Sequence, residues 1–232
     1  MSGVTRRVRI ERRFCGPPAS GNGGYVAGLL AAELGGSDCE VMLKAPPPLE
    51  RPLAIGRDGP SVLLRDGDKV IAAAAPAQVE RKLPRAPSLA EAMAAQANYA
   101  GFRAHPFPGC FVCGPEREEG DGLRIFPGPV AGGVAAPFAP GAGLCRDGLL
   151  GCEFVWSALD CPGYFAVQDR AGPALLGKIA VHVAQPIRCG EDLVVLGWPI
   201  GSSGRKHRAG TALFRGGEAL AWAAATWISI GH

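Results

Sequence analysis

With 232 residues, of which 47% are hydrophobic and 19% charged, the chain can form one large or two small globular domains, and a disordered protein is excluded. The formal net charge is +3 and the lysines and arginines are scattered, which argues against a nucleic-acid partner. The sequence shows no signal peptide and no apolar run of the ~20 residues that cross a bilayer. We therefore expect a soluble, cytoplasmic protein without a membrane partner.

The first half predicts one helix followed by a meander of strands. The helix is expected at residues 23–34, GGYVAGLLAAEL, directly after Asn22. Residues 40–79 then alternate between apolar segments and turns, with a tight turn at Asp66-Gly67. The alanine run at 72–75 is helical by propensity alone, but its place after a glycine turn and its Val-Ile flank favour a strand.

A further helix is expected between the two halves. Ser88 is a favoured N-cap residue, and Glu91, three positions later, completes the pattern of a capping box. We therefore predict a helix in SLAEAMAAQANYAGF, inside a linker that spans residues 85–104.

Eight cysteines lack the regular spacing of a disulfide framework, so we expect buried thiols. Only Cys110 and Cys113, in CFVCG, form a close pair, whereas a tetrahedral zinc site needs four ligands. His105 is separated from the pair by two prolines, and three further cysteines are isolated in the sequence: Cys145, Cys152 and Cys161. A redox pair is typically found at the start of a helix in a βαβ unit, whereas Gly-Pro follows here. Two small side chains packing at the entrance of a strand are therefore favoured, and no metal is expected.

The second half repeats the first. Residues 153–167, EFVWSALDCPGYFAV, form a second apolar helical segment, in which Pro162 can kink the helix. Residues 178–228 repeat the order of apolar segments and turns, with a tight turn at Gly216-Gly217 and an alanine-rich strand at 223–225. Each half thus predicts one long helix followed by an antiparallel meander, an α+β arrangement in which a sheet wraps a buried helix.

This layout resembles the thioesterase superfamily in its double-hotdog form, in which two hotdog units share one chain. SGNGGYVAGLLAAEL is similar to the start of the hotdog helix in acyl-CoA thioesterases, and SALDCPGYFAV to the second helix of two-hotdog thioesterases. CFVCGPEREEGDGLRIFPG is similar to the opening of many thioesterase-superfamily domains, where the cysteine pair is not a metal site. The resemblance implies two antiparallel sheets, each wrapped around one long helix, in an N-terminal unit at 1–84 and a C-terminal unit at 105–232.

The head of the first helix is a candidate oxyanion site. Backbone N–H groups at a helix N-terminus favour the negative charge that develops on a thioester carbonyl. The resemblance assigns this role to Gly23 and Gly24, with Asn22 beside them. The alternative is an ordinary N-cap, because asparagine is a favoured capping residue. Both interpretations remain open.

Asp160 is the main catalytic candidate. It lies in an apolar helical stretch, where an unpaired carboxylate is costly. One reason for its presence is general-base catalysis on a water, with burial raising its pKa, and the resemblance favours this role. The other is a structural hydrogen bond, for instance to Trp156 or His182.

The sequence departs from the two-hotdog thioesterases at two positions, where those enzymes use a glutamine and a hydroxyl from neighbouring strands. The glutamine position falls near Thr226, a further catalytic candidate because its hydroxyl can hold a water. The hydroxyl position falls near Leu176 or Gly177, and neither side chain can replace a hydroxyl. This departure leaves room for a protein that binds acyl thioesters without cleaving them.

Four residues are candidates for substrate binding: Tyr25, Trp156, Arg205 and Lys206. The last two belong to a basic loop at 202–208, which we interpret first as a solvated hairpin tip and second as a clamp for the phosphates of coenzyme A. His182 lies in an alternating strand, where hydrogen bonding is a more usual role than catalysis.

The sequence therefore predicts a hydrolase of lipid metabolism that cleaves acyl-CoA or acyl-carrier thioesters with an Asp-activated water and no cofactor. The alternative is a non-catalytic acyl-CoA binding or regulatory protein. A hotdog hydratase would need a His-Asp or His-Glu pair, which no segment matches. One composite site per chain is expected, because the first helix lacks an aspartate and the second lacks Asn-Gly-Gly. The expected partner is a small-molecule acyl thioester, and a homo-oligomer is compatible with this fold.

Overall fold

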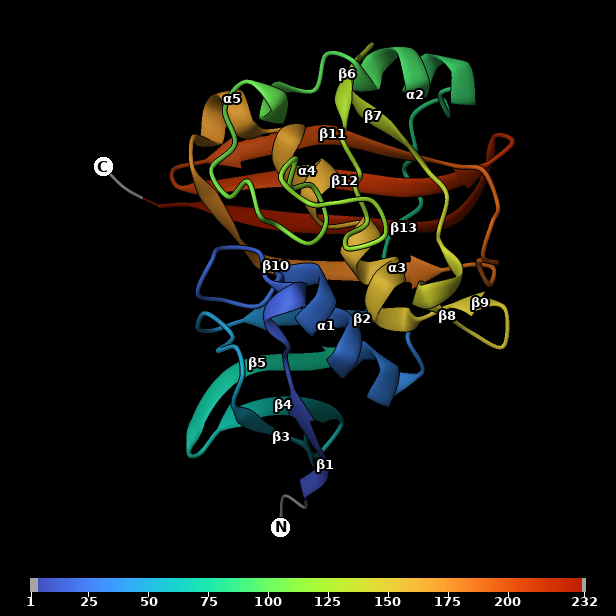
Figure 1. Cartoon of the computed structure of the whole chain (residues 1–232). Coiled ribbons are helices and arrows are strands. Elements are labelled where there is room, and N and C mark those ends of the chain that lie inside the picture. The colour runs from blue at the N-terminus through green and yellow to red at the C-terminus, as the bar shows by residue number, and fades with distance from the viewer. Residues whose placement is uncertain (1–3, 231–232) are drawn as a thin grey trace.

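The computed structural model describes residues 4–230, which form one large antiparallel sheet with most of the helices on its concave side (Figure 1). Eleven strands follow the order β1-β3-β4-β5-β2-β10-β13-β12-β11-β7-β6. The strands of the first half are β1 (Val4–Arg9), β2 (Cys39–Leu43), β3 (Pro52–Asp58), β4 (Ser61–Asp66) and β5 (Lys69–Pro76). Those of the second half are β6 (Gly128–Val130), β7 (Gly133–Phe138), β10 (Ala174–Val183), β11 (Leu193–Ser203), β12 (Lys206–Arg215) and β13 (Glu218–Ser229).

The two halves meet edge to edge at strands β2 and β10, which pair antiparallel with Val41 opposite Ile179. The sequence predicts two antiparallel sheets joined side by side, and the structure joins them through this pair of strands into one continuous sheet. Because the edge strand of each half pairs with that of the other, the ladder of hydrogen bonds is continuous, and neither edge is left open at the joint.

The repeat that the sequence predicts is present as two matching sets of four strands, in the spatial orders β2-β5-β4-β3 and β10-β13-β12-β11. Both alanine runs are strands, within β5 and β13, so position and flanking residues outweigh helix propensity here. Gly216 and Gly217 have φ values of 53° and 90° and join β12 to β13, which confirms the predicted tight turn.

Two helical segments pack against each other on the concave side of the sheet (Figure 1). The first is α1 (Gly23–Ala31), continued by a 3-10 turn at Ala32–Leu34. The second is α3 (Cys152–Ala158), followed after a break at Leu159 and Asp160 by α4 (Cys161–Phe165). The sequence predicted one long helix at 153–167, and the structure divides it, because Pro162 lacks the N–H that would continue the helical ladder.

Glycines allow α1 and α3 to approach closely. A Cβ on Gly24 would lie 2.6 Å from the Cβ of Asp160, and a Cβ on Gly28 would lie 2.5 Å from the Cα of Glu153. These two contacts also show that the helices run antiparallel, since Gly24 faces the end of α3 and Gly28 faces its start.

The predicted linker helix is α2 (Leu89–Gln96), with a complete capping box between Ser88 and Glu91. It is shorter than the predicted segment and packs against β6 and β7, so it is part of the C-terminal half of the sheet (Figure 1). The remaining elements are the short helix α5 (Gln168–Ala171) and the small hairpin of β8 (Cys145–Arg146) and β9 (Leu149–Leu150).

The expectation that all cysteines are thiols is wrong for Cys145 and Cys189, which form a disulfide between the β8–β9 hairpin and the segment before β11. Their Cα atoms lie 6.4 Å apart, within the usual range for such a bond. Disulfides are more typical of oxidising compartments, so the cytoplasmic location stays a prediction.

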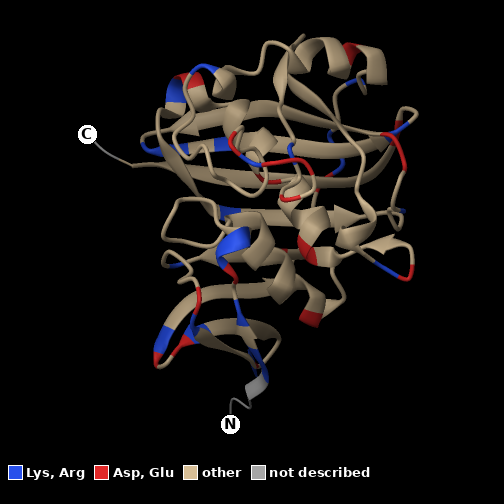
Figure 2. Ribbon diagram, viewed as in Figure 1, with Lys and Arg blue, Asp and Glu red and all other residues tan. Residues whose placement is uncertain are grey.

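Within residues 4–230, none of the helices has the length and apolar character required to cross a membrane. Basic and acidic residues are interspersed along the outer strands and loops, and the middle of the sheet is largely uncharged (Figure 2). This distribution agrees with the scattered charge that the sequence predicts.

Candidate functional site

A cavity of about 720 Å³ lies where the two halves meet. Its walls come from the segment before α1, the turn after β2, the break between α3 and α4, and the strands β10 and β13. Apolar side chains dominate one side of it, among them Leu43, Leu176 and Ile228. The volume falls in the range typical of sites for small organic ligands.

Asp160 lies on the wall of this cavity, at the break between α3 and α4, and is only 1% exposed. Its Oδ2 accepts hydrogen bonds from the backbone N–H of Gly24 (2.9 Å) and from Nδ2 of Asn22 (3.1 Å). Its Oδ1 is buried without a hydrogen-bond partner among the described residues. Burial raises the pKa of Asp160 to about 7, although the hydrogen bonds from Gly24 and Asn22 oppose this rise. Neither Trp156 nor His182 is its partner.

Asn22 is the N-cap of α1, one of the two roles that the sequence left open, and it also contacts Asp160. Its Oδ1 accepts from the N–H of Tyr25 (2.9 Å), as an N-cap does, while its Nδ2 donates to Asp160. Gly24 has a different role from the predicted one, because its N–H is engaged by Asp160 and its missing Cβ makes room for α3. Gly23, the first residue of α1, lines the cavity, and its N–H has no acceptor within the helix.

The break that exposes Asp160 to the cavity is itself stabilised. The carbonyl oxygen of Leu159 accepts a 2.7 Å hydrogen bond from the buried hydroxyl of Thr211 on β12. Gly163 donates its N–H to the carbonyl oxygen of Asp160 (2.9 Å). The backbone at Asp160 is therefore held by bonds on both sides.

Of the four predicted substrate-binding residues, only Arg205 lines the cavity. Lys206 is exposed and lies outside the lining. Trp156 is fully buried between the helices and donates to the carbonyl oxygen of Gly36 (3.0 Å). Tyr25 stacks on Phe14 with ring centroids 4.1 Å apart, and burial raises its pKa to about 12. Trp156 and Tyr25 are therefore core residues.

Thr226 is half-buried and does not line the cavity. Its neighbours Trp227 and Ile228 on β13 do line it. Leu176 and Gly177, at the position where the resemblance implies a hydroxyl, line the cavity with an apolar surface. His182 has its own partner, with Nδ1 lying 2.8 Å from Oδ1 of Asp38, as the sequence predicts for a structural histidine.

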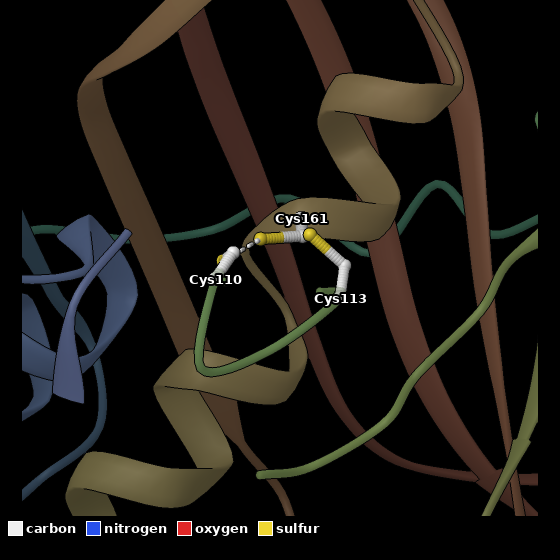
Figure 3. Close-up of side chains that lie close together, drawn as sticks. All are labelled: Cys110, Cys113 and Cys161. Atoms are coloured by element: carbon white, nitrogen blue, oxygen red, sulfur yellow. Dashed lines mark hydrogen bonds between the residues drawn. The ribbon is translucent and has the colours of Figure 1, made fainter. Parts of the chain in front are cut away.

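Three cysteines meet beside Asp160 (Figure 3). The sulfur atoms of Cys110, Cys113 and Cys161 lie within 4.8 Å of one another, and all three residues are buried on the cavity wall. Cys161 is therefore not isolated, and His105 does bend back, with Nε2 lying 3.3 Å from the sulfur of Cys113. Hydrogen bonds from the thiols of Cys113 and Cys161 hold the pKa of Cys110 well below its usual range.

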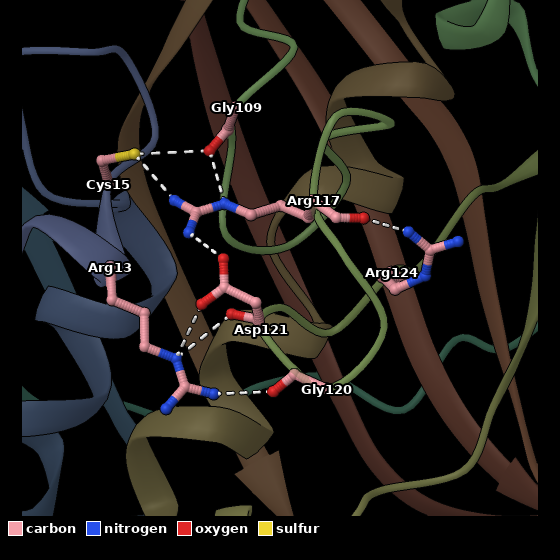
Figure 4. A network of polar contacts seen from close by, with 7 residues as sticks. All are labelled: Arg13, Cys15, Gly109, Arg117, Gly120, Asp121 and Arg124. Atoms are coloured by element: carbon pink, nitrogen blue, oxygen red, sulfur yellow. Dashed lines mark hydrogen bonds and ion pairs between the residues drawn. The ribbon is translucent and has the colours of Figure 1, made fainter.

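A polar network fixes the segment that carries the cysteine pair (Figure 4). Arg117 donates to the carbonyl oxygen of Gly109 (2.8 Å) and pairs with Asp121 (2.7 Å). Arg13, from the N-terminal segment, pairs with the same Asp121 (3.3 Å), and Arg124 donates to the carbonyl oxygen of Arg117. The network ties this wall of the cavity to the first half of the chain.

No family model matches the chain, and no curated protein matches it. Solved structures of similar fold include a TesB protein of Mycobacterium avium subsp. paratuberculosis, at 15% identity and a TM-score of 0.62, covering 99% of this chain and 96% of that one. A candidate oleoyl thioesterase of Lactobacillus plantarum has 10% identity and a TM-score of 0.60, covering 99% and 97%. A candidate thioesterase II of Thermobifida fusca has 15% identity and a TM-score of 0.60, again covering 99% and 97%.

The chain shares the hotdog fold of these three structures. Identities of 10–15% establish the fold alone, so the chemistry depends on the residues of this chain.

Within this hotdog fold, sequence reasoning missed several cavity residues, among them Lys44, Tyr164 and Trp227. Trp227 matters most, because its Nε1 is a buried donor without a hydrogen-bond partner in the described part of the chain. The alternation of side chains along β13 could have predicted that Trp227 points toward the helices, but nothing in the sequence shows which of these side chains reaches a cavity. Two unpaired polar atoms, Asp160 Oδ1 and Trp227 Nε1, thus lie on the wall of one cavity.

Proposed function

We propose that the chain is a double-hotdog protein that hydrolyses acyl thioesters of coenzyme A or a carrier protein, with units at 1–84 and 105–232 joined by a linker at 85–104. The observation that carries the proposal is a buried carboxylate, Asp160, with one free oxygen on the wall of a cavity shared by the two halves. A buried acid without a full set of partners costs stability, so a function that uses the free oxygen accounts for it.

The reaction follows from this arrangement. A water hydrogen-bonded to Oδ1 of Asp160 attacks the thioester carbonyl carbon and transfers one proton to the carboxylate. The carbon–sulfur bond then breaks, the proton passes to the leaving thiolate, and the products are a carboxylic acid and a thiol. The hydrogen bonds from Gly24 and Asn22 to Oδ2 keep the carboxylate oriented so that Oδ1 remains free.

When water attacks, the thioester carbonyl oxygen gains negative charge, which a hydrogen-bond donor must stabilise. Gly23 is the best candidate, because it is the first residue of α1 and its N–H is free of helical bonding. The N–H of Gly24 is engaged by Asp160, so we assign the oxyanion role to Gly23 alone of this pair.

The rest of the substrate fits the remaining walls. Leu43, Leu176 and Ile228 offer an apolar surface to an acyl chain. Arg205 and Lys44 are exposed cations on the same cavity, suited to the phosphates of a coenzyme A moiety. Lys206 lies next to Arg205 on the hairpin tip, outside the lining, and is a weaker candidate for the same contact.

The test compares two buried acids of the same helical segment, Asp160→Asn and Glu153→Gln. Acyl-CoA substrates of several chain lengths are supplied, and the acid and free coenzyme A are quantified by chromatography, which avoids thiol reagents that would react with the protein. We expect Asp160→Asn to lower kcat by about 10²–10⁴-fold, the usual contribution of a general base. Glu153→Gln keeps the wild-type rate, because Glu153 does not line the cavity.

Two results would contradict this proposal. Equal rates for wild type and Asp160→Asn would remove Asp160 from the mechanism. If neither protein cleaves any substrate but both bind acyl-CoA in calorimetry, the chain is instead the non-catalytic acyl-CoA binding protein that the missing hydroxyl at Leu176 and Gly177 also allows.

A further inference from the structure

The three cysteines beside Asp160 come from two different segments. Cys110 and Cys113 lie in the loop before β6, and Cys161 begins α4 (Figure 3). The sulfurs of Cys110 and Cys161 are 3.8 Å apart. Two thiolates bound to one zinc ion at ~2.3 Å in tetrahedral geometry are separated by about 3.8 Å. This pair therefore already has the spacing that a shared metal requires.

We propose that Cys110, Cys113 and Cys161 form a binding site for a thiophilic divalent cation of the zinc type. The remaining sulfur–sulfur distances, all within 4.8 Å, require a contraction of about 1 Å or less, which side-chain rotation supplies. The site does not depend on thioester hydrolysis, and it is tested by metal content.

The loop that carries Cys110 and Cys113 closes in a tight turn. Nδ2 of Asn22 lies 3.9 Å from the sulfur of Cys110, and Gly114 donates its N–H to the carbonyl oxygen of Cys110 (2.9 Å). A Cβ on Gly114 would overlap the backbone of Cys110, so only glycine closes the turn this tightly. N–H donors aimed at a sulfur stabilise a thiolate, the form that binds metal.

The other two sulfurs also have donors. Nδ2 of Asn22 lies 3.9 Å from the sulfurs of both Cys110 and Cys161, and Nε2 of His105 lies 3.3 Å from that of Cys113. The N–H of Phe107 donates to Nδ1 of His105 (2.8 Å), so the ring hydrogen is on Nε2. His105 is therefore a donor to Cys113 and not a ligand, a supporting role common around bound metals.

A buried cysteine elsewhere in the chain has no such neighbours. Cys39 is fully buried in β2 and is not part of the cluster. Packing alone thus accounts for an isolated thiol, but not for three that converge from separate segments with an N–H donor on each. Because all three also line the cavity, the metal would have three protein ligands and a fourth position for water or another small ligand.

The test measures zinc in the purified full-length chain. The protein is reduced, stripped with a chelator, exposed to Zn²⁺ and freed of excess metal by gel filtration, and the bound zinc is quantified by mass spectrometry. We expect about one ion per chain in the wild type and in the matched control Cys39→Ser. In Cys113→Ser and Cys161→Ser, occupancy falls roughly tenfold or more, because two thiolates remain. Circular dichroism checks that each variant is folded.

Cobalt provides a second measurement on the wild type alone. Bound Co²⁺ in a tetrahedral, thiolate-rich site gives intense visible and thiolate-to-metal charge-transfer bands, and added Zn²⁺ removes them. A fully reduced wild type that retains no zinc and shows no such bands overturns the proposal, whether or not the variants fold. Equal zinc in the wild type and in folded Cys113→Ser and Cys161→Ser also overturns it, since the metal would then lie elsewhere.

Discussion

The two ends of the α1–α3 helix pair differ, although the same two helices build both. At the cavity end, where α1 begins and α3 ends, the N–H of Gly24 meets the carboxylate of Asp160 and a cavity follows. At the packed end, where α1 ends and α3 begins, Nε1 of Trp156 donates to Gly36 and the sulfur of Cys152 to the carbonyl oxygen of Gly28 (3.5 Å). At the packed end, side chains donate hydrogen bonds to backbone carbonyl oxygens. At the cavity end, a backbone N–H donates a hydrogen bond to a side-chain carboxylate.

Each end also contains one buried acid. Glu153, at the packed end, is 8% exposed and pairs with Arg146 at 3.3 Å. Asp160 is 1% exposed, and no cation within residues 4–230 pairs with it. Burial of a carboxylate is thus not in itself a functional signal in this fold. The lack of a counterion, together with an unpaired oxygen on a cavity, separates the functional candidate from the structural one.

The largest expected effect comes from closing the helix contact at each end. Gly24→Ala and Gly28→Ala both place a methyl group against α3, and overpacking of this kind costs about 1–3 kcal/mol of unfolding free energy. Only Gly24→Ala displaces Asp160, so we expect its rate on acyl-CoA to fall by roughly 10²-fold, the usual cost of about 1 Å of misplacement. Urea unfolding and rate per folded chain are measured for both.

The distinction between the two ends fails if Gly24→Ala and Gly28→Ala lower the unfolding free energy equally and also lower the rate on acyl-CoA equally. In that case the helix pair moves as one body, and the two ends are not independent. If Gly28→Ala loses rate and Gly24→Ala does not, the assignment of the cavity end is wrong.

A smaller effect is expected when only one donor to Asp160 is removed. Asn22→Ser keeps an efficient N-cap for α1, so the change of cap itself alters the free energy of unfolding by less than about 0.5 kcal/mol. The variant loses the Nδ2 bond to Oδ2, and a hydrogen bond to a charged group is worth about 1.5–3 kcal/mol. We therefore expect kcat to fall by about 10- to 100-fold, measured by the chromatographic assay.

Asn22→Ala is the matched variant, because it removes both the cap and the donor. Its kcat should match that of Asn22→Ser, while its stability falls by a further ~1 kcal/mol. A wild-type rate in Asn22→Ser would show that the Gly24 N–H alone orients the carboxylate.

The sequence carries much of this arrangement, for identifiable reasons. The capping box at Ser88, the glycine turn at 216–217 and the alanine-rich strands depend on neighbours in the chain, and local patterns predicted them correctly. Asp160 was recognisable because a charged residue in an apolar helical segment is unusual, and Pro162 marked the place where the helix breaks.

The remainder depends on contacts between segments far apart in the chain. Cys161 lies 51 positions from Cys110, and Gly24 lies 136 positions from Asp160, so no local pattern brings them together. The hydrogen bond from Gly24 to Asp160 is a consequence of close helix packing. Two glycines four residues apart could suggest that α1 packs closely against another helix, but the sequence could not show which helix that is. The sequence also could not tell which strands join the two sheets, β2 and β10, since alternation alone does not identify the neighbour of a strand.

The smallest effect is expected at the packed end. Arg146→Ala removes the cation beside Glu153, but the arginine side chain is 82% exposed, and pairs of this kind contribute about 0.2–1 kcal/mol. We expect a loss of stability within that range in urea unfolding and a kcat equal to wild type, because the pair lies at the far end of α3 from Asp160. A fall in kcat beyond about threefold, outside what a surface pair can explain, would mean that the packed end controls the cavity end through the length of α3. The two acids would then be coupled, and the distinction between a structural and a catalytic carboxylate in this helix pair would no longer hold.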